Sequence, residues 1–321
     1  MTRPILATWP TLRRGMFHAA LALARHLPYP LMHLAAKATG SVGWWLDAAG
    51  RRRVTRNLAP MLPVRSEALA RCVRRSYDSF FLNTAEVLRI DRLPGWFLDA
   101  DHLRLIDPWG VFAVRPRPGP TIVVTTHGHH ELLLAAAARL DLAEQVQAVS
   151  LPQSDPLLDD LYDRLRGAVR CRSLRLDRAP LAALRALRDG LTLGILADRD
   201  YTGNGLEVRA AGRQWRVPAG PAALAVQTGA PIVPLLLIRT SPTAFALVVA
   251  KPLKACPGAA KNLELERLTR AMAASLLRLV STAPGQWLTF HSLWRDPTSA
   301  TSSSSPTCSP QPKRRNAPDP C

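Results

Sequence analysis

Short β-branched runs alternate with helical stretches from residue 121 onward, and this alternation constrains the fold more than any other feature of the chain. Strands are expected at 121–126, 146–150, 191–197, 231–238 and 244–250, with a two-stranded excursion at 207–217 that turns at Gly212. Helices are expected at 131–140, 155–165, 179–190, 218–229 and 265–280. Strands that alternate with helices assemble through βαβ crossovers. The sequence therefore predicts an α/β fold whose mostly parallel or mixed central sheet is flanked by helices.

The N-terminal part has a different character. Residues 11–48 are apolar and helix-rich, with Arg13, Arg14, Arg25 and Lys37 placed between the apolar residues. Two interpretations are open: helices that lie in a lipid headgroup layer with their basic side chains among the phosphates, or a hairpin that packs on the core. The chain has no run of eighteen uncharged apolar residues and no signal-peptide pattern, so a spanning protein is not expected.

These patterns divide the chain into three segments. We expect a membrane-associating helical region at 1–50, a folded α/β domain at 51–296, which opens with a long helix within 65–90, and a disordered Ser/Pro-rich tail at 297–321. Five scattered cysteines without C-x-x-C spacing indicate neither a disulfide framework nor a zinc site, and favour a reducing compartment.

The net charge of +18, from 42 basic and 24 acidic residues, favours an anionic partner such as nucleic acid, phospholipid headgroups or an acidic carrier protein. Aromatic residues are not interleaved with the basic ones as a base-stacking platform would require. We therefore expect no nucleic-acid partner.

The candidate chemistry lies where the first of these strands meets a helix. His127, His129 and His130 follow the strand directly, and Glu131 falls in the first turn of the helix, where the dipole favours a carboxylate. Open α/β sheets place their sites at this kind of junction. One imidazole held by Glu131 would be a competent general base. Polar residues that merely cap the helix are the alternative.

A metal site is a third possibility. The THGHHE stretch resembles the histidine motif of the metallo-β-lactamase superfamily. That pattern needs Asp at 131 and His at 132, where this chain has Glu131 and Leu132. Only His291 remains downstream, which leaves too few ligands, so no metal is expected.

Six stretches, in the right order, resemble the lauroyl/myristoyl acyltransferases of lipid A biosynthesis, within the glycerolipid acyltransferase superfamily. They are RRRVTRNLAPMLP, LNTAEVLRI with Glu86, TTHGHHE, the loop from Asp198 to Tyr201, AGPAALAVQTGAPIVPL and PGQWLTFHSLWR. The resemblance spans most of residues 25–296. It implies a peripheral enzyme on the cytoplasmic side of the inner membrane that moves a fatty acyl group from acyl carrier protein or acyl-CoA to a hydroxyl of a lipid A precursor or related amphiphile. No cofactor is implied, because the thioester carries the driving energy.

The resemblance also suggests roles for residues. His127 is the expected general base and Glu131 its orienting partner, with His129 or His130 as the alternative base. The expected substrate-binding residues are His129, His130, Arg164, Arg166, Asp198, Arg199, Asp200 and Gly220. Three alternatives stay open: Arg199 forms an ion pair with a neighbouring aspartate, Arg164 and Arg166 belong to a solvated basic face, and Gly220 simply starts a helix.

The chain also departs from the family pattern. The family places its histidine five residues before the acidic residue, and an ungapped alignment puts Thr126 there. Ser150 and Leu151 replace a Tyr-Arg pair, and Ala210 and Ala211 replace two aromatic residues. The competing hypothesis is a non-catalytic relative that binds membranes or acyl carriers. An enzyme needs one imidazole within hydrogen-bond reach of Glu131 and facing an apolar groove.

Overall fold

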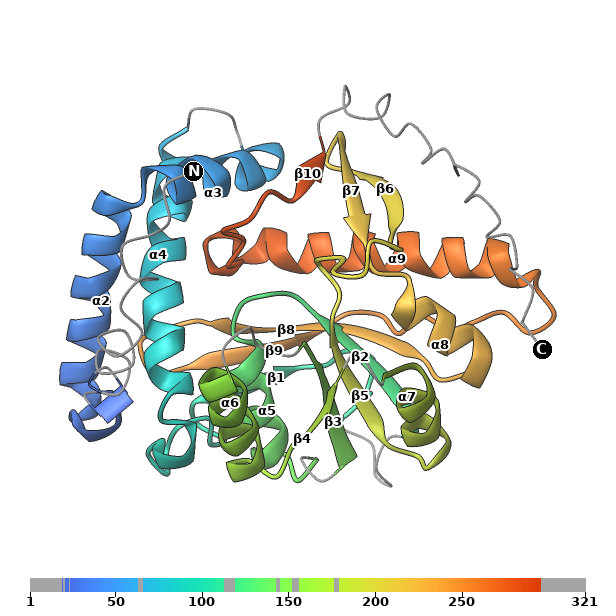
Figure 1. The fold of residues 1–321 in the computed structure, drawn as a ribbon, viewed down its shortest axis with the longest axis horizontal. Coiled ribbons are helices and arrows are strands. Elements are labelled where there is room, and N and C mark those ends of the chain that lie inside the picture. The colour runs from blue at the N-terminus through green and yellow to red at the C-terminus, as the bar shows by residue number, and fades with distance from the viewer. Residues whose placement is uncertain are drawn as a thin grey trace, which may run out of the picture.

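A seven-stranded sheet forms the centre of the molecule in the computed structural model (Figure 1). The structure describes residues 19, 21–22, 24–62, 66–112, 119–142, 145–151, 156–175 and 179–295. The strand order is β1-β9-β8-β2-β5-β3-β4. All neighbours are parallel except β8 and β9, which are antiparallel. The predicted α/β class with a mostly parallel sheet is confirmed.

The strands of this sheet are short, apart from β8. They are β1 (Leu103–Ile106), β2 (Thr121–Thr125), β3 (Val146–Ser150), β4 (Arg172–Arg175), β5 (Thr192–Leu196), β8 (Ile232–Arg239) and β9 (Phe245–Val249). The sequence did not indicate β1 or β4. Each has only four residues, and charged Arg104, Arg172 and Arg175 interrupt the apolar pattern that marks the other strands.

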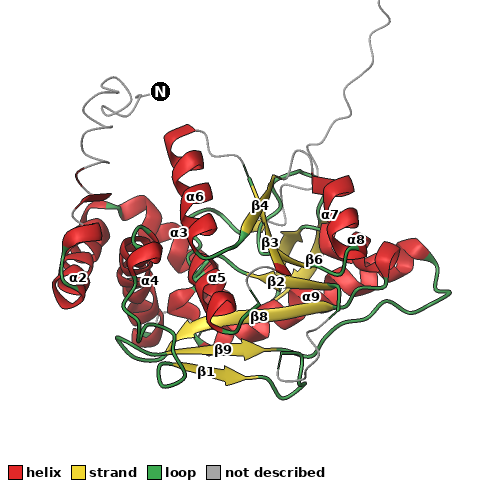
Figure 2. Cartoon of the chain, turned by 90° about the horizontal axis from the view of Figure 1, so that it is seen from below, coloured by secondary structure: helices red, strands yellow, loops and turns green. Residues whose placement is uncertain are grey.

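Helices cover both faces of the sheet (Figure 2). They are α2 (Tyr29–Leu46), α3 (Ala48–Leu58), α4 (Glu67–Val87), α5 (His130–Arg139), α6 (Pro156–Ala168), α7 (Ala179–Arg188), α8 (Gly220–Thr228) and α9 (Lys261–Thr282). One core cluster joins α5 and α6 to one side of the sheet and includes Leu132, Leu161 and Val123. The other cluster joins α7, α8 and α9 to the opposite side, around Ile122 and Val124.

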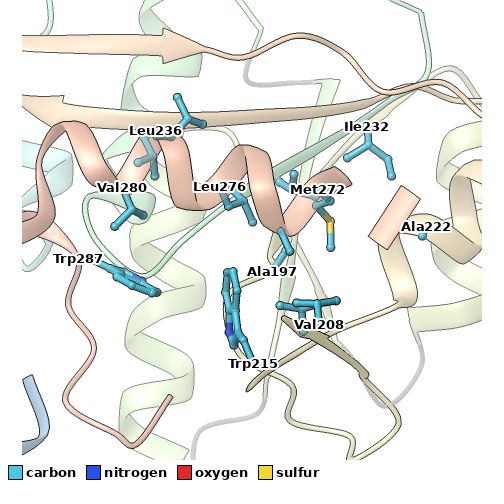
Figure 3. Packing of buried hydrophobic residues seen from close by; sticks show 14 of the residues in the cluster. Ala197, Val208, Trp215, Ala222, Ile232, Leu236, Met272, Leu276, Val280 and Trp287 are labelled. Atoms are coloured by element: carbon cyan, nitrogen blue, oxygen red, sulfur yellow. The ribbon is translucent and has the colours of Figure 1, made fainter. Parts of the chain in front are cut away.

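A second, three-stranded antiparallel sheet packs over α9. Its strands are β6 (Leu206–Ala210), β7 (Arg213–Val217) and β10 (Trp294–Arg295), in the order β10-β7-β6. The expected two-stranded excursion is thus confirmed, with Gly212 at its turn at φ 72°. Trp215 of β7 and Trp287 belong to the same buried cluster as Met272 and Leu276 of α9 (Figure 3).

The N-terminal helices pack on the rest of the domain through α4. Met32, Ala36 and Gly40 belong to the buried face of α2. Buried Glu86 of α4 accepts hydrogen bonds from the Tyr29 hydroxyl at 2.6 Å and from Arg239 of β8, and so ties three elements together. Among the described residues, no helix is both long and apolar enough to cross a membrane. The tail at 297–321 lies outside the described residues.

Candidate active site

Parallel pairing of β2 with β5 brings together the two residues at the centre of the site. Thr125 is aligned with Leu196, and the Ala197 amide donates to the Thr125 carbonyl at 2.9 Å, which extends the pairing by one step. His127 and Asp198 each come two residues after the last aligned pair. They therefore leave the same edge of the sheet side by side, at the carboxyl ends of neighbouring strands.

Asp198 holds His127 through both of its oxygens. The ring nitrogen Nδ1 of His127 lies 2.7 Å from Oδ1 of Asp198, and the His127 backbone N–H donates to Oδ2 at 3.0 Å. The indole N–H of Trp287 donates to the same Oδ2 at 2.8 Å, and the indole N–H of Trp215 donates to the Asp198 carbonyl at 3.1 Å. The Asp198 side chain is fully buried, so these donors replace water and fix its orientation.

The pKa shifts follow from these contacts. Burial alone would favour a neutral Asp198, but His127, the Trp287 indole and the His127 N–H hold its pKa at about 2. Burial likewise disfavours protonated His127, yet the charge of Asp198 outweighs burial and raises the pKa of His127 above its usual value. A carboxylate against Nδ1 assigns the proton to Nδ1. The lone pair of Nε2 is then free to accept a proton.

Tyr201 lies against that lone pair. Its hydroxyl is 3.1 Å from Nε2 of His127, and its ring carries the Arg199 guanidinium carbon 4.5 Å from its centre. The Tyr201 side chain remains partly exposed. Burial raises the pKa of Tyr201, so its hydroxyl stays protonated and donates to Nε2. A hydroxyl group thus already occupies the position from which His127 can take a proton.

The prediction that Glu131 orients His127 is wrong. Glu131 points from the first turn of α5 toward α6, where Arg166 donates to both carboxylate oxygens, from Nε to Oε2 at 3.1 Å and from a terminal nitrogen to Oε1. Burial opposes ionisation of Glu131, but Arg166 lowers its pKa below the usual value. Nε2 of His130 lies 3.8 Å from Oε1 of Glu131, which is too long for a hydrogen bond.

His129 is a structural residue. Its Nε2 lies 3.1 Å from Oε1 of Gln286, whose amide is fixed because Oε1 also accepts from the Arg239 N–H while Nε2 donates to the Arg239 carbonyl. Nδ1 faces the Asn83 side chain at 3.1 Å. Burial and the nearby Arg239 lower the pKa of His129 to about 3, so the ring is neutral. It connects α4 with the loop after α9.

Gly128, between His127 and His129, packs closely against the backbone at Gln286. A β-carbon at this position would lie 2.9 Å from the Gln286 carbonyl oxygen, so a larger residue would push apart the loops that hold His127 and His129.

A cavity of about 740 Å³ opens beside His127. Its wall is mainly apolar and comes from β2, β3, β5, α5, α6, α7 and α8. Five of the eight expected substrate-binding residues line it, as do His127 and Glu131; the five are His130, Arg166, Arg199, Asp200 and Gly220. Asp198 does not line the cavity but is hydrogen-bonded to His127, which does. Arg164 instead bonds the Asp160 carbonyl on an exposed face of α6, and His129 lies outside the lining.

Asp198 and Asp200 each have partners other than Arg199. Asp198 holds His127, and Asp200 accepts from the Thr202 and Gly205 amides at 3.0 and 2.7 Å. The cation paired with Asp200 is Arg216, at 3.9 Å. Within the described ranges, no three His, Cys, Asp or Glu side chains are grouped so that they could hold a metal ion.

Comparison with known proteins agrees with this geometry. Residues 11–296 match the family described as bacterial lipid A biosynthesis acyltransferase. The chain belongs to this family. The resemblance predicted from the six stretches is therefore confirmed, and acyl transfer is the chemistry that the family shares.

Curated relatives carry a second name. The chain is 29% identical over 119 residues to a phosphatidylinositol mannoside acyltransferase of Mycolicibacterium smegmatis, a match that covers 37% of each protein. Proteins of the same name from two Mycobacterium tuberculosis strains, CDC 1551 / Oshkosh and H37Rv, are 42% identical over 59 residues, which cover 18% of this chain and 19% of theirs. The matched part thus spans well under half of these relatives.

Sequence reasoning missed the roles of Asp198, Tyr201 and Trp287. All three lie in stretches that carried the resemblance, the loop at 198–201 and PGQWLTFHSLWR. The available signal was that Asp198 directly follows a predicted strand, as the histidine cluster does. The sequence did not show that β2 pairs with β5, because β5 is inserted between β2 and β3, which follow each other in the chain.

Proposed function

We propose that this protein is an O-acyltransferase that moves a fatty acyl group from a thioester donor to a hydroxyl of a glycolipid. The observation that carries the proposal is the His127–Asp198 pair, whose Nε2 accepts a hydrogen bond from the Tyr201 hydroxyl beside a mainly apolar cavity. A cavity of about 740 Å³ falls within the usual range for small-molecule sites, and its lining suits an acyl chain.

The reaction then follows the logic of a Ser-His-Asp site in which the substrate supplies the hydroxyl. Nε2 of His127 takes the proton as the acceptor oxygen attacks the thioester carbonyl, so a C–O bond forms and a tetrahedral intermediate results. Asp198 stabilises the imidazolium. The intermediate collapses, the C–S bond breaks, and the leaving sulfur takes the proton from His127, which returns to its starting state.

Tyr201 supports this assignment of the acceptor position. Its hydroxyl rests on Nε2 of His127, in the place that an acceptor hydroxyl must occupy for proton transfer. Because the Tyr201 side chain is partly exposed, the incoming acceptor can displace it without disturbing the core. Arg199, stacked on the same ring, lies where it can meet a phosphate of the donor or acceptor.

The names found in the comparisons support a glycolipid acceptor. The family is named for lipid A biosynthesis and the curated relatives for phosphatidylinositol mannosides. We propose a lipid A precursor or a related glycolipid as acceptor, and acyl carrier protein or acyl-CoA as donor. Either donor is anionic, and the charge of +18 favours both.

We also propose a peripheral position on the cytoplasmic side of the inner membrane, and the exposed apolar face of α2 supports attachment to a membrane surface. Leu31, Leu34, Val42, Trp45 and Leu46 are 52–81% exposed and lie within about a third of the helix circumference at 100° per residue. The opposite face of α2 packs on α4. Exposed Arg52 and Arg53 on neighbouring α3 add charge suited to anionic headgroups, so α2 can lie in the headgroup layer without crossing it.

The test of the function is thiol release from an acyl donor by the purified protein. Acyl carrier protein and acyl-CoA are supplied in separate reactions, each with a lipid A precursor or a phosphatidylinositol mannoside, and products are weighed by mass spectrometry. The proposal expects a glycolipid heavier by one acyl group, formed by wild type and lost in His127→Gln. Acceptor-independent thiol release, or product formation unchanged in His127→Gln, would contradict it.

Membrane association has its own test. Vesicle flotation should recover the protein with anionic vesicles and not with neutral ones at moderate salt. Trp45→Glu should reduce recovery, whereas Leu263→Glu, at an exposed leucine of α9, serves as the matched control. Equal recovery of both variants would argue against α2 as the attachment face.

A further inference from the structure

β3 is more exposed than its position in the sheet predicts. It lies between β5 and β4, with helices over both faces of the sheet, and strands in such a position are normally buried. All five residues of β2 are buried, whereas all five of β3 are partly exposed, and so are the last three of β5. Within the described ranges, space that no side chain fills therefore adjoins β3 and the end of β5.

The cause is a split between these two strands. β3 and β5 pair only from Val146 with Thr192 to Ala148 with Gly194. Beyond that point β5 stays paired with β2 as far as Leu196, and β3 stays paired with β4 as far as Ser150. The carboxyl halves of β3 and β5 are thus not paired with each other, although β3 remains paired with β4 and β5 with β2.

The cavity beside His127 runs through this split. Val149 and Ser150 line it from β3, and Ile195 and Leu196 line it from β5. Its lining also includes Leu134 and Tyr162 of α5 and α6, and Pro180, Ala183 and Leu224 of α7 and α8. These two helix pairs cover opposite faces of the sheet. The cavity therefore extends across the plane of the sheet instead of ending against it.

We propose that the acyl chain crosses the sheet between β3 and β5, and that the paired residues Ala148 and Gly194 set the longest chain that fits. This inference rests on the proposed function. Ala148 and Gly194 are the last aligned pair before the strands part, and both line the cavity. They form the closed end of the split, where a side chain larger than methyl would take space from the chain.

The backbone at Gly194 allows that space to be filled without a clash. A β-carbon there would meet its nearest neighbours, the Gln147 carbonyl oxygen and Cγ1 of Val146, at 3.9 and 4.0 Å, which is ordinary contact. Leu193 and Ile195 on either side belong to the cluster of α7, α8 and α9. Strand alternation therefore directs a side chain at 194 toward α5 and α6, into the part of the cavity lined by Leu134 and Tyr162.

The experiment measures chain-length profiles for wild type, Gly194→Ala, Gly194→Val and Ala148→Val. Acyl donors of increasing length are compared by kcat/KM, and fatty acids of the same lengths are compared by displacement of a fluorescent fatty acid, which needs no turnover. Gly167→Ala, at an exposed glycine of α6 outside the cavity, is the control. Circular dichroism checks that each variant is folded.

We expect the valine variants to keep short chains and to lose long ones, by roughly fourfold for each methylene group that is excluded. Gly194→Ala should shift the profile in the same direction by less, and Gly167→Ala should not shift it. Unchanged profiles in folded valine variants, or an equal loss at every length, would overturn the inference. If wild type binds fatty acids but transfers none, the proposed function fails, while the binding profiles still decide the role of Gly194.

Discussion

Asp198→Asn is the substitution that most directly probes the arrangement around His127. Asparagine has the shape of aspartate but presents one acceptor oxygen and one donor NH₂. The outcome therefore depends on which of the two faces Nδ1 of His127. In the wild type Oδ1 faces Nδ1, and Oδ2 accepts from the Trp287 indole and from the His127 backbone N–H.

Those two donors decide the orientation of the asparagine amide. If its NH₂ faced them, two buried N–H groups would lose their acceptor, at about 1–3 kcal/mol each. The opposite orientation keeps both bonds and turns the NH₂ toward Nδ1 of His127. That nitrogen must then accept, so the imidazole proton moves to Nε2. The lone pair that takes the proton from the acceptor hydroxyl is lost.

The expected loss in kcat is large. Locking a catalytic histidine in the wrong tautomer costs about 10⁴-fold in a Ser-His-Asp site, or about 5 kcal/mol of barrier. Acyl transfer by Asp198→Asn is compared with wild type, and two-bond proton–nitrogen NMR of the imidazole reports the tautomer. Asp200→Asn is the matched control, because Asp200 holds the Thr202 and Gly205 amides without contacting His127, and it should lose less than about tenfold.

Two results would refute this reasoning. One is transfer by Asp198→Asn within about tenfold of wild type. The other is an NMR spectrum that still shows the proton on Nδ1 of His127. Either would mean that Trp287 and the His127 N–H do not fix the group at position 198.

Four further predictions concern the same site. Glu131→Ala should lower the free energy of unfolding in urea by about 3 kcal/mol, because it leaves Arg166 without its buried partner, and Glu131→Ala/Arg166→Met should recover part of that loss. The acid limb of kcat/KM should have its midpoint above the usual histidine pKa, since Asp198 raises the pKa of His127; a midpoint below that value would contradict the pair. The same shift means that the pair stabilises the fold fully below the unfolded-state pKa of His127 and loses this contribution as pH rises through the folded-state pKa, which urea titrations of wild type and His127→Gln would show. Tyr201→Phe removes the hydroxyl from Nε2 and should lower KM for the acceptor with kcat within about tenfold; a complete loss of kcat would instead make Tyr201 a reacting group.

Much of the fold was accessible from the sequence because its central strands are apolar and regularly spaced. β2, β5, β8 and β9 are read directly from runs such as TIVVT and IVPLLLIR. The short edge strands β1 and β4 could not be predicted from the sequence, because their pairing depends on neighbours that are remote in the chain. The order of the strands was also hidden, and with it the fact that β5 lies directly against β2.

The site divides in the same way. The position of His127 at the end of a strand was predictable from local pattern, and so was the helix that follows it. The carboxylate partner of His127 was not predictable from local pattern, because Glu131 is close in sequence whereas Asp198 is brought close only by the pairing of the strands. Local charge pattern favours the nearer residue. In this structure Arg166 of α6, 35 positions further along, satisfies Glu131 instead.

The unusual histidine spacing and the change of partner are two consequences of one geometric fact. Thr125 and His127 line the cavity, whereas Thr126 between them is buried outside its lining, as expected where side chains alternate. In this chain a histidine at position 126, where the family pattern places it, would point away from the cavity. At position 127 it faces both the cavity and the end of β5, where Asp198 receives it. Glu131 is then released from any contact with the base, and its pairing with Arg166 stabilises the wall of the cavity.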